Sequence, residues 1–362
     1  MMFKTLQHLR WTVVGLAAVV LFHIVIENSA AEKWEVISQL PTERSAFSTA
    51  VVDGKIYLIG GARFEIGNGP IGLSTVEVYD PENNSWKRVA DMPTPRASAR
   101  AAVVDGKIYV VGGFFAIDRL RVNTKILKIV EVYDPQADTW ERKQDMSQPR
   151  FLFGIGVVKR KIYVIGGANF FENPWRLDHV EVYDPDTNSW RKRANLSMRR
   201  DGFETVVVDG SIYVIGGRGW PIVNQSGPIL TAIEVYEPRI NRWSKKSDLP
   251  NHRHGFSTVV VGGNVYLIGG LEGAAFEKHM RKVAVYNPRN ERWKSSIPML
   301  TDNVPFGAAA VDGKIYVLGS ERKNGELSLD IEVFNTGFRA VNAIGKLSTR
   351  WGELKAHRQN QP

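Results

Sequence analysis

A regular series of arginines is the feature of this sequence best suited to binding chemistry. At five places an arginine stands four residues after a leucine or methionine. These are Arg44, Arg96, Arg150, Arg200 and Arg253. The sixth place holds Asn303. The rigid fork of a guanidinium matches carboxylate and phosphate groups, so the series predicts a site for an anionic ligand. The alternative is that each arginine binds backbone carbonyl groups beside it, and the sequence leaves both interpretations open.

A second candidate is a pair of charges that interrupts a series of small residues. Counting back from each hairpin turn, the same strand position holds Ser48, Arg100, Gly154, Glu204, Ser257 and Gly307. Burying a charge is costly unless the charge is paired. We therefore expect Arg100 and Glu204 to meet through water across a channel, or one of them to serve a ligand. They are the residues we would assign to catalysis if the protein were an enzyme, and otherwise we predict no catalytic residue.

Other catalytic and metal chemistries find little support. The chain has no cysteine, which excludes disulfides, thiolate metal sites and a cysteine nucleophile. It has no G-x-S-x-G motif of the serine hydrolases. His252 and His254 stand two residues apart, where we expect polar rim residues and not metal ligands. We predict no metal and no cofactor.

The charge balance bears on partners. The formal net charge is +9, with acidic and basic residues interspersed and without a Lys/Arg block. We therefore expect no nucleic-acid partner. A basic surface favours an anionic protein or glycan as ligand.

Three sequence markers recur in one order along the chain, and they define the repeat in which the candidate residues above hold equivalent positions. The first is a glycine pair, with a Gly-Ser variant in the last copy, starting at Gly60, Gly112, Gly166, Gly216, Gly269 and Gly319. The second is a tryptophan with leucine or methionine six residues later, at Trp34, Trp86, Trp140, Trp190, Trp243 and Trp293. The third is "VEVYDP" or a close variant. Their common period of about 50 residues identifies an internal repeat.

Each repeat is predicted to form four short antiparallel strands, which we name a, b, c and d. In the second repeat, residues 98–104 form strand a and Asp105-Gly106 the tight turn that favours positive φ. Residues 107–113 form strand b, 129–134 strand c with its alternating pattern, and 140–146 strand d. Four antiparallel strands in a unit of this length predict a β-propeller blade and an all-β fold.

These markers resemble the kelch repeat, with its glycine pair after the Ile-Tyr strand, its later tyrosine and the tryptophan behind it. The resemblance covers residues 32 to about 335 and implies a six-bladed kelch β-propeller. It leaves function open, because propellers carry many activities. Some intracellular kelch adaptors hold acidic peptides with arginines of this region, which the resemblance implies as one role for the arginine series. The copper-radical oxidases of this fold need a cysteine that this chain lacks.

The first tryptophan precedes every strand a, b or c, which predicts how the ring closes. We expect residues 33–40, with Trp34, to supply the outer strand of the last blade, whose other strands lie near residues 306–334. The competing segment is the C-terminal stretch, with Phe338 or Trp351 in place of Trp34. Its spacing fits less well, because nine residues and not six separate Phe338 from Leu347.

The strand order places the b–c loops and the d–a links on the same face of the propeller, where binding is expected. Six-fold geometry would put the arginine series in a ring around the channel mouth on this face. The b–c loops add aromatic side chains with basic residues between them, which suit sugars or acidic peptides. Among them we take Phe115, Trp175 and Trp220 as ligand-binding candidates. The alternative is that the aromatic side chains pin long loops onto the propeller.

The N-terminus predicts a secretory signal over residues 1–31. Lys4 and Arg10 precede an apolar run from Trp11 to Ile26, and small residues end at Ala31. We place cleavage after Ala31, which makes the protein secreted or periplasmic. The alternative is an uncleaved membrane anchor with the propeller outside. The domains are then the signal segment 1–31, the propeller 32–335 and a C-terminal tail 336–362, in a protein we expect to be a monomer.

From the sequence we predict a non-catalytic binding or scaffold module, with a glycan or acidic peptide on the face of the b–c loops and d–a links. The alternative is a secreted sugar-modifying enzyme of the mutarotase or epimerase kind, for which secreted kelch propellers give precedent. A third interpretation is an architectural repeat that holds no ligand.

Overall fold

The computed structural model describes residues 33–338, apart from 66–68, 117–123, 173, 220–227 and 273–277. The predicted signal segment, Trp220, Trp351 and most of the predicted tail lie outside these residues. The described residues form β-strands and no α-helix. Accordingly, no helix in this part of the chain has the length and apolar character needed to cross a membrane.

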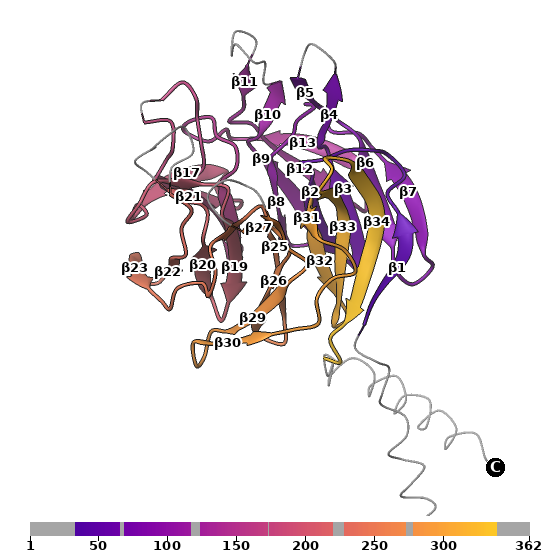
Figure 1. The fold of residues 1–362 in the computed structure, drawn as a ribbon. Helices are drawn as coiled ribbons and strands as arrows, with labels where there is room; N and C mark the ends of the chain where they lie inside the picture. Colours follow the sequence, from indigo (N-terminus) through magenta and orange to yellow (C-terminus); the bar gives the residue numbers. More distant parts are fainter. Residues whose placement is uncertain are drawn as a thin grey trace, which may run out of the picture. The chain divides into compact units, whose positions relative to one another are not determined.

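Most strands belong to sheets that repeat one plan, with strands a, b, c and d side by side (Figure 1). Sheet 1 is β2 (Ser48–Val52), β3 (Lys55–Ile59), β6 (Val76–Asp80) and β7 (Ser85–Val89). Sheet 2 is β8 (Arg100–Val104), β9 (Lys107–Val111), β12 (Val130–Asp134) and β13 (Thr139–Lys143). Sheet 3 is β14 (Gly154–Val158), β15 (Lys161–Ile165), β16 (Val180–Asp184) and β17 (Ser189–Arg193).

The remaining repeats continue this plan. Sheet 4 is β19 (Glu204–Val208), β20 (Ser211–Ile215), β22 (Ile233–Glu237) and β23 (Arg242–Lys245). Sheet 5 is β25 (Ser257–Val261), β26 (Asn264–Ile268), β29 (Val283–Asn287) and β30 (Arg292–Ser295). Sheet 6 combines β31 (Asn303–Pro305), β32 (Ala308–Val311), β33 (Lys314–Arg322) and β34 (Leu327–Asn335) with β1 (Trp34–Gln39).

On one face, short strands pair the b–c loops with one another and with the d–a links. One sheet contains β4 (Ala62–Glu65), β5 (Gly69–Gly72), β10 (Phe114–Ala116) and β11 (Lys125–Ile126). A second pairs β18 (Arg200–Asp201) with β21 (Arg218–Gly219). A third contains β24 (Arg253–His254), β27 (Leu271–Glu272) and β28 (Lys278–His279). These pairings hold the expected binding face to the sheets beneath it.

The glycine pairs of the repeat are needed because two neighbouring repeats approach closely there. Gly60 has φ of 63°, and a Cβ at this position would lie 2.5 Å from the carbonyl oxygen of Arg96. The N–H of the next residue, Gly61, donates a hydrogen bond of 3.0 Å to that carbonyl. A side chain would therefore push the d–a link of sheet 2 off sheet 1.

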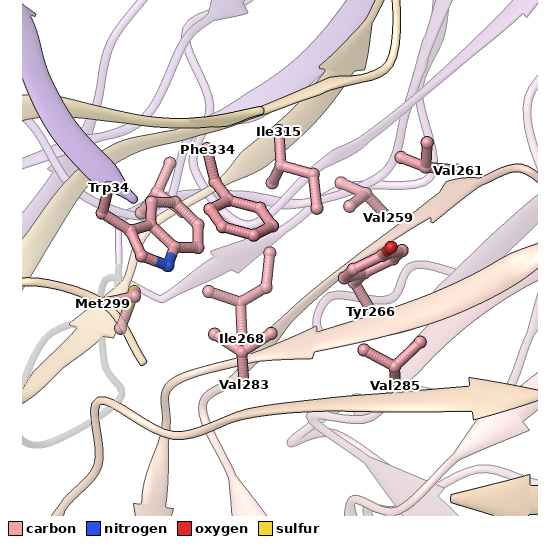
Figure 2. Close-up of a cluster of buried hydrophobic side chains, with 11 residues drawn as sticks. Trp34, Val259, Val261, Tyr266, Ile268, Val283, Val285, Met299, Ile315 and Phe334 are labelled. Carbon is pink, nitrogen blue, oxygen red and sulfur yellow. The ribbon is translucent and has the colours of Figure 1, made fainter. Parts of the chain in front are cut away.

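β1 brings the start of the described chain to its end. It pairs antiparallel with β34, and Trp34 lies opposite Phe334 with ring centroids 5.2 Å apart. Figure 2 shows these two rings facing Ile268 and Val283 of sheet 5. Trp34 Nε1 donates a hydrogen bond of 3.0 Å to the carbonyl of Ile297. Phe338 instead lies beside the turn glycines Gly262 and Gly313, so it does not hold the place of Trp34.

The core consists of apolar layers between successive sheets. The innermost strands contact one another in the order β2, β8, β14, β19, β25 and β32, and β32 in turn contacts β2. One buried cluster combines Val78 of sheet 1 with Ile108 and Tyr133 of sheet 2, and the same arrangement recurs between later sheets. These inner strands border the space that we call the channel, and the positions singled out in the sequence lie at or next to their first residues.

Candidate ligand-binding pocket in the channel

The arginine series lies inside the sheets and not at the channel mouth. Arg44 is fully buried, and its Nη1 donates hydrogen bonds of 3.0 Å to the carbonyls of Gly60 and Thr75. Its Nη2 forms an ion pair with the carboxylate of Glu77 on strand c. Burial lowers the pKa of Arg44, and the charge of Glu77 opposes that shift. This arginine therefore ties the d–a link to strands b and c of its own sheet.

The same arrangement recurs along the chain. The equivalent buried pairs are Arg96 with Glu131, Arg150 with Glu181 and Arg200 with Glu234. Arg253 is also buried, at 2% exposed, but strand c of sheet 5 carries Ala284 in place of the glutamate. The expected ring of exposed guanidinium groups around the channel mouth is wrong, because all five arginines are buried and four of them pair with a glutamate of their own sheet. The site described below contains none of the five.

A pocket of about 470 Å³ occupies the channel and opens between the d–a links. Its wall includes the first residues of the inner strands, among them Ser48, Arg100, Glu204 and Ser257. Its rim is formed by residues of the d–a links, such as Gly202 and Gly255, and by Arg218 of a b–c loop. The pocket thus lies on the face where binding was expected.

Arg100 and Glu204, the two charges that interrupt the series of small residues, meet directly. Their Nη2 and Oε1 atoms lie 3.1 Å apart, and both side chains are partly exposed to the channel. Arg100 Nε also donates a hydrogen bond of 3.0 Å to the carbonyl of Phe153. Thr258 donates to the second carboxylate oxygen of Glu204 over 3.4 Å. The pair is therefore anchored on both sides and needs no bridging water.

Gly154 explains how the side chain of Arg100 reaches Glu204 across the inner strand between them. β14 lies between β8 and β19, and Gly154 holds the wall position between the two charges. A Cβ there would lie 2.3 Å from Thr205 Cγ2 and 2.5 Å from the ring of Phe203. The missing side chain leaves space at the wall between the two charged residues.

A second charged cluster lies at the rim, and the sequence interpretation missed it. Asp201 is fully buried, and its Oδ1 lies 2.9 Å from Arg218 Nε and 3.3 Å from Arg176 Nε. Arg176 also donates a hydrogen bond of 2.6 Å to the carbonyl of Gly219. Only Arg218 of the three lines the pocket, with 27% of its side chain exposed. Asp201 thereby orients a cation toward the channel.

His254 lies on the same rim as Arg218. Burial, together with the smaller effect of the charge of Arg218, lowers the pKa of His254 to about 4. The imidazole is therefore neutral at neutral pH and leaves Arg218 and Arg100 as the cations of the pocket. His254 belongs to the rim, as expected from the sequence, although it is buried.

The aromatic candidates occupy different environments. Phe115 is 39% exposed on β10. Trp175 packs against Phe170 in an apolar cluster beneath the loops, and the guanidinium of Arg176 lies 4.5 Å from the centre of its ring. Neither Phe115 nor Trp175 lines the channel pocket. Trp175 therefore matches the loop-pinning alternative.

In the part of the chain that the structure describes, no group of three His, Cys, Asp or Glu side chains is placed to hold a metal ion. The pocket offers instead two guanidinium groups, one carboxylate and several hydroxyls. Such a set can bind an anionic group and hydrogen-bond to neutral polar groups beside it.

Comparison with known proteins places the chain in a family. Residues 30–280 match the family described as Attractin/LZTR1 beta-propeller, and the chain belongs to this kelch-type propeller family. Kelch-like protein 36 of Bos taurus is 28% identical over 273 residues, 69% of this chain and 40% of that protein. Alpha-scruin of Limulus polyphemus is 30% identical over 141 residues, 39% of this chain and 15% of that protein. The chain thus spans less than half the length of these curated relatives.

A solved structure supports the same fold. The structure of YjhT aligns with a TM-score of 0.67 at 16% identity, covering 82% of this chain and 96% of that one. At this identity the likeness concerns the fold alone. The all-β propeller and the resemblance to kelch repeats, both predicted from the sequence, are confirmed.

Proposed function

We propose that this protein is a binding module that takes an anionic ligand, a glycan or an acidic peptide, into the channel pocket. The observation that supports it most strongly is the wall of the pocket. Arg100, Glu204 and Arg218 line a hollow of about 470 Å³ whose other residues are mostly small or hydroxylated. Pockets of this size hold small molecules or short peptide segments.

The charges suggest how a ligand is held. Arg218 is fixed through its Nε by Asp201, which leaves its terminal N–H groups for a carboxylate of the ligand. Glu204 of β19 can accept hydrogen bonds from hydroxyl groups of a ligand, and Ser257 and Thr258 of β25 line the same pocket. A ligand with a carboxylate and neighbouring hydroxyls, such as an acidic sugar, suits this arrangement.

The pocket rests on an architecture that we propose to be a ring of six blades. Sheets 1 to 6 are the blades, and β1 is the outer strand that joins the two ends of the chain. The contact of β32 with β2 and the pairing of β1 with β34 support this proposal. We further propose a monomer that is exported by the segment 1–31, so that its pocket faces an extracytoplasmic space. N-terminal sequencing of the mature protein tests the cleavage after Ala31.

Glycan and acidic-peptide arrays test the binding proposal. The variants are Arg100→Ala and Arg218→Ala, and the control is Arg142→Ala on the outer strand of sheet 2, where Arg142 pairs with Asp145 at the surface. We expect at least a tenfold loss of array signal for Arg218→Ala, and none for the control. Unchanged binding by both pocket variants would overturn the proposal.

A sugar-modifying enzyme of the mutarotase or epimerase kind is the second candidate. The observation that favours it is the partly exposed carboxylate of Glu204, placed in the pocket and held by Arg100. Such a carboxylate can transfer a proton to or from a sugar hydroxyl. Anomer exchange measured by NMR, lost in Glu204→Gln, would establish this candidate in place of a non-catalytic module.

A further inference from the structure

Sheet 5 departs from the repeat at its buried ion pair. In sheets 1 to 4 the second residue of strand c is a glutamate that binds the buried arginine of the d–a link. In sheet 5 this residue is Ala284, while the arginine, Arg253, is retained and is 2% exposed. The cation of the pair is therefore present without the anion that accompanies it elsewhere.

Arg253 lacks the contacts of its counterparts. Among the described residues, its Nη1 atom has no hydrogen-bond partner, whereas an unpartnered Nε is shared with Arg44, Arg150 and Arg200. The equivalent Nη1 of Arg44 donates to two carbonyl groups. Burial lowers the pKa of Arg253, and the carboxylate of Glu272 opposes that shift from a distance. Glu272 is itself occupied, because it accepts a hydrogen bond of 2.9 Å from Asn251 and lies 3.4 Å from Lys278 Nζ.

In sheet 5 a cavity lies beside Ala284, at the position where sheets 1 to 4 have the glutamate side chain. It has a volume of about 360 Å³ and is lined by Arg253, Ala284, Lys282, Lys294 and Trp293, among others. The equivalent place in sheet 3, beside Glu181, measures about 90 Å³. The replacement of a glutamate by alanine thus coincides with a larger cavity that is bordered by three cationic side chains and one aromatic side chain.

We propose that this cavity binds a carboxylate from outside the chain, in the place that a glutamate occupies in sheets 1 to 4. Arg253 receives the carboxylate, and Lys282 and Lys294 add positive charge at the entrance. Trp293 and the adjoining prolines Pro250 and Pro298 form the wall for the attached carbon chain. The carboxylate belongs either to a small free acid or to an aspartate or glutamate side chain of a partner peptide. This site is separate from the channel pocket and does not depend on the proposed function.

The test supplies the missing carboxylate within the chain. In Ala284→Glu the new side chain should pair with Arg253 and close the site, as Glu181 does beside Arg150. Binding of succinate, and of an Asp/Glu-containing peptide with its Asn/Gln counterpart as reference, is measured by calorimetry at constant ionic strength. The matched control is Ala137→Glu, which adds the same charge at an exposed turn.

We expect wild type and Ala137→Glu to bind a carboxylate probe, and Ala284→Glu to bind it at least tenfold more weakly. Binding of succinate would identify a small acid as the ligand class, and binding of the acidic peptide alone would identify a partner side chain. In an Arg218→Ala background, which weakens binding in the channel pocket, Ala284→Glu should lower carboxylate binding by the same factor, and this separates the two sites. Absence of carboxylate binding in wild type, or equal binding by Ala284→Glu, would overturn the proposal. Circular dichroism verifies that the variant is folded.

Discussion

The structural role of the arginine series can be tested by comparing two arginines that occupy equivalent places with different partners. Arg150 is fully buried and its Nη2 lies 3.2 Å from Glu181, whereas Arg253 faces Ala284. Replacing Arg150 by methionine leaves the carboxylate of Glu181 buried without its cation. Removal of one partner from a buried ion pair costs about 3–5 kcal/mol. Arg253→Met leaves no such carboxylate in strand c, so we expect it to cost less than about 1 kcal/mol or to stabilise the protein.

Urea unfolding followed by tryptophan fluorescence measures both variants against wild type. The double variant Arg150→Met/Glu181→Leu removes the uncompensated charge and should regain most of the loss, as an apolar replacement of a buried pair often does. If Arg150→Met does not fold, Arg150→Lys provides a milder form of the same test. Equal destabilisation by Arg150→Met and Arg253→Met would refute the argument that the glutamate partner determines the role of each arginine.

Two further predictions concern the last sheet. Trp34→Ala removes the stacking on Phe334 and the hydrogen bond to Ile297, and it should lower the free energy of unfolding in urea by about 3–5 kcal/mol. The control Val36→Ala changes a half-exposed residue of the same strand and should cost little. Similar small effects of both variants would contradict the proposed closure by β1. Burial raises the pKa of Glu332, which has Asn303 where the other sheets have arginine. Its contribution to stability is therefore full below the ordinary glutamate pKa and is lost as the pH rises through the raised pKa. Glu332→Gln should stabilise the protein at pH 7 by on the order of 1 kcal/mol, and the difference should shrink toward pH 4. Melting curves at pH 4, 5.5 and 7 check this, and a difference that does not vary with pH would argue against a buried charged carboxylate.

The fold was accessible from the sequence because its signals are local and repeated. The tight turns, the Ile-Tyr strands and the glycine pairs recur with one period, although sheet 3 turns at Lys159-Arg160, sheet 5 has Val265-Tyr266 and the last copy has Gly319-Ser320. The place of Trp34 in the last sheet followed from counting the repeat markers, because Trp34 precedes every strand a. The placement of the arginine series did not follow, because a ring at the mouth and a ring within the sheets share the same spacing.

In sheets 1 to 4 the arginine and the glutamate of "VEVYD" or "IEVYE" occur together. Sheet 5 keeps the arginine with Ala284, and sheet 6 keeps the glutamate, Glu332, with Asn303. Because each residue also occurs without the other, the sequence did not distinguish the two placements. The rim cluster was missed for a related reason. The positions of Asp201 and Arg218 vary from repeat to repeat and hold other polar residues, His254 and Glu321, so neither residue stood out in the sequence.

A single array experiment tests whether the channel pocket binds an anionic ligand. Wild type, Arg218→Ala and Arg142→Ala are compared on an array of acidic sugars and acidic peptides. We expect a wild-type signal that Arg142→Ala retains in full and that Arg218→Ala lowers by at least tenfold. A wild-type signal that Arg218→Ala and Arg100→Ala both retain in full would contradict it.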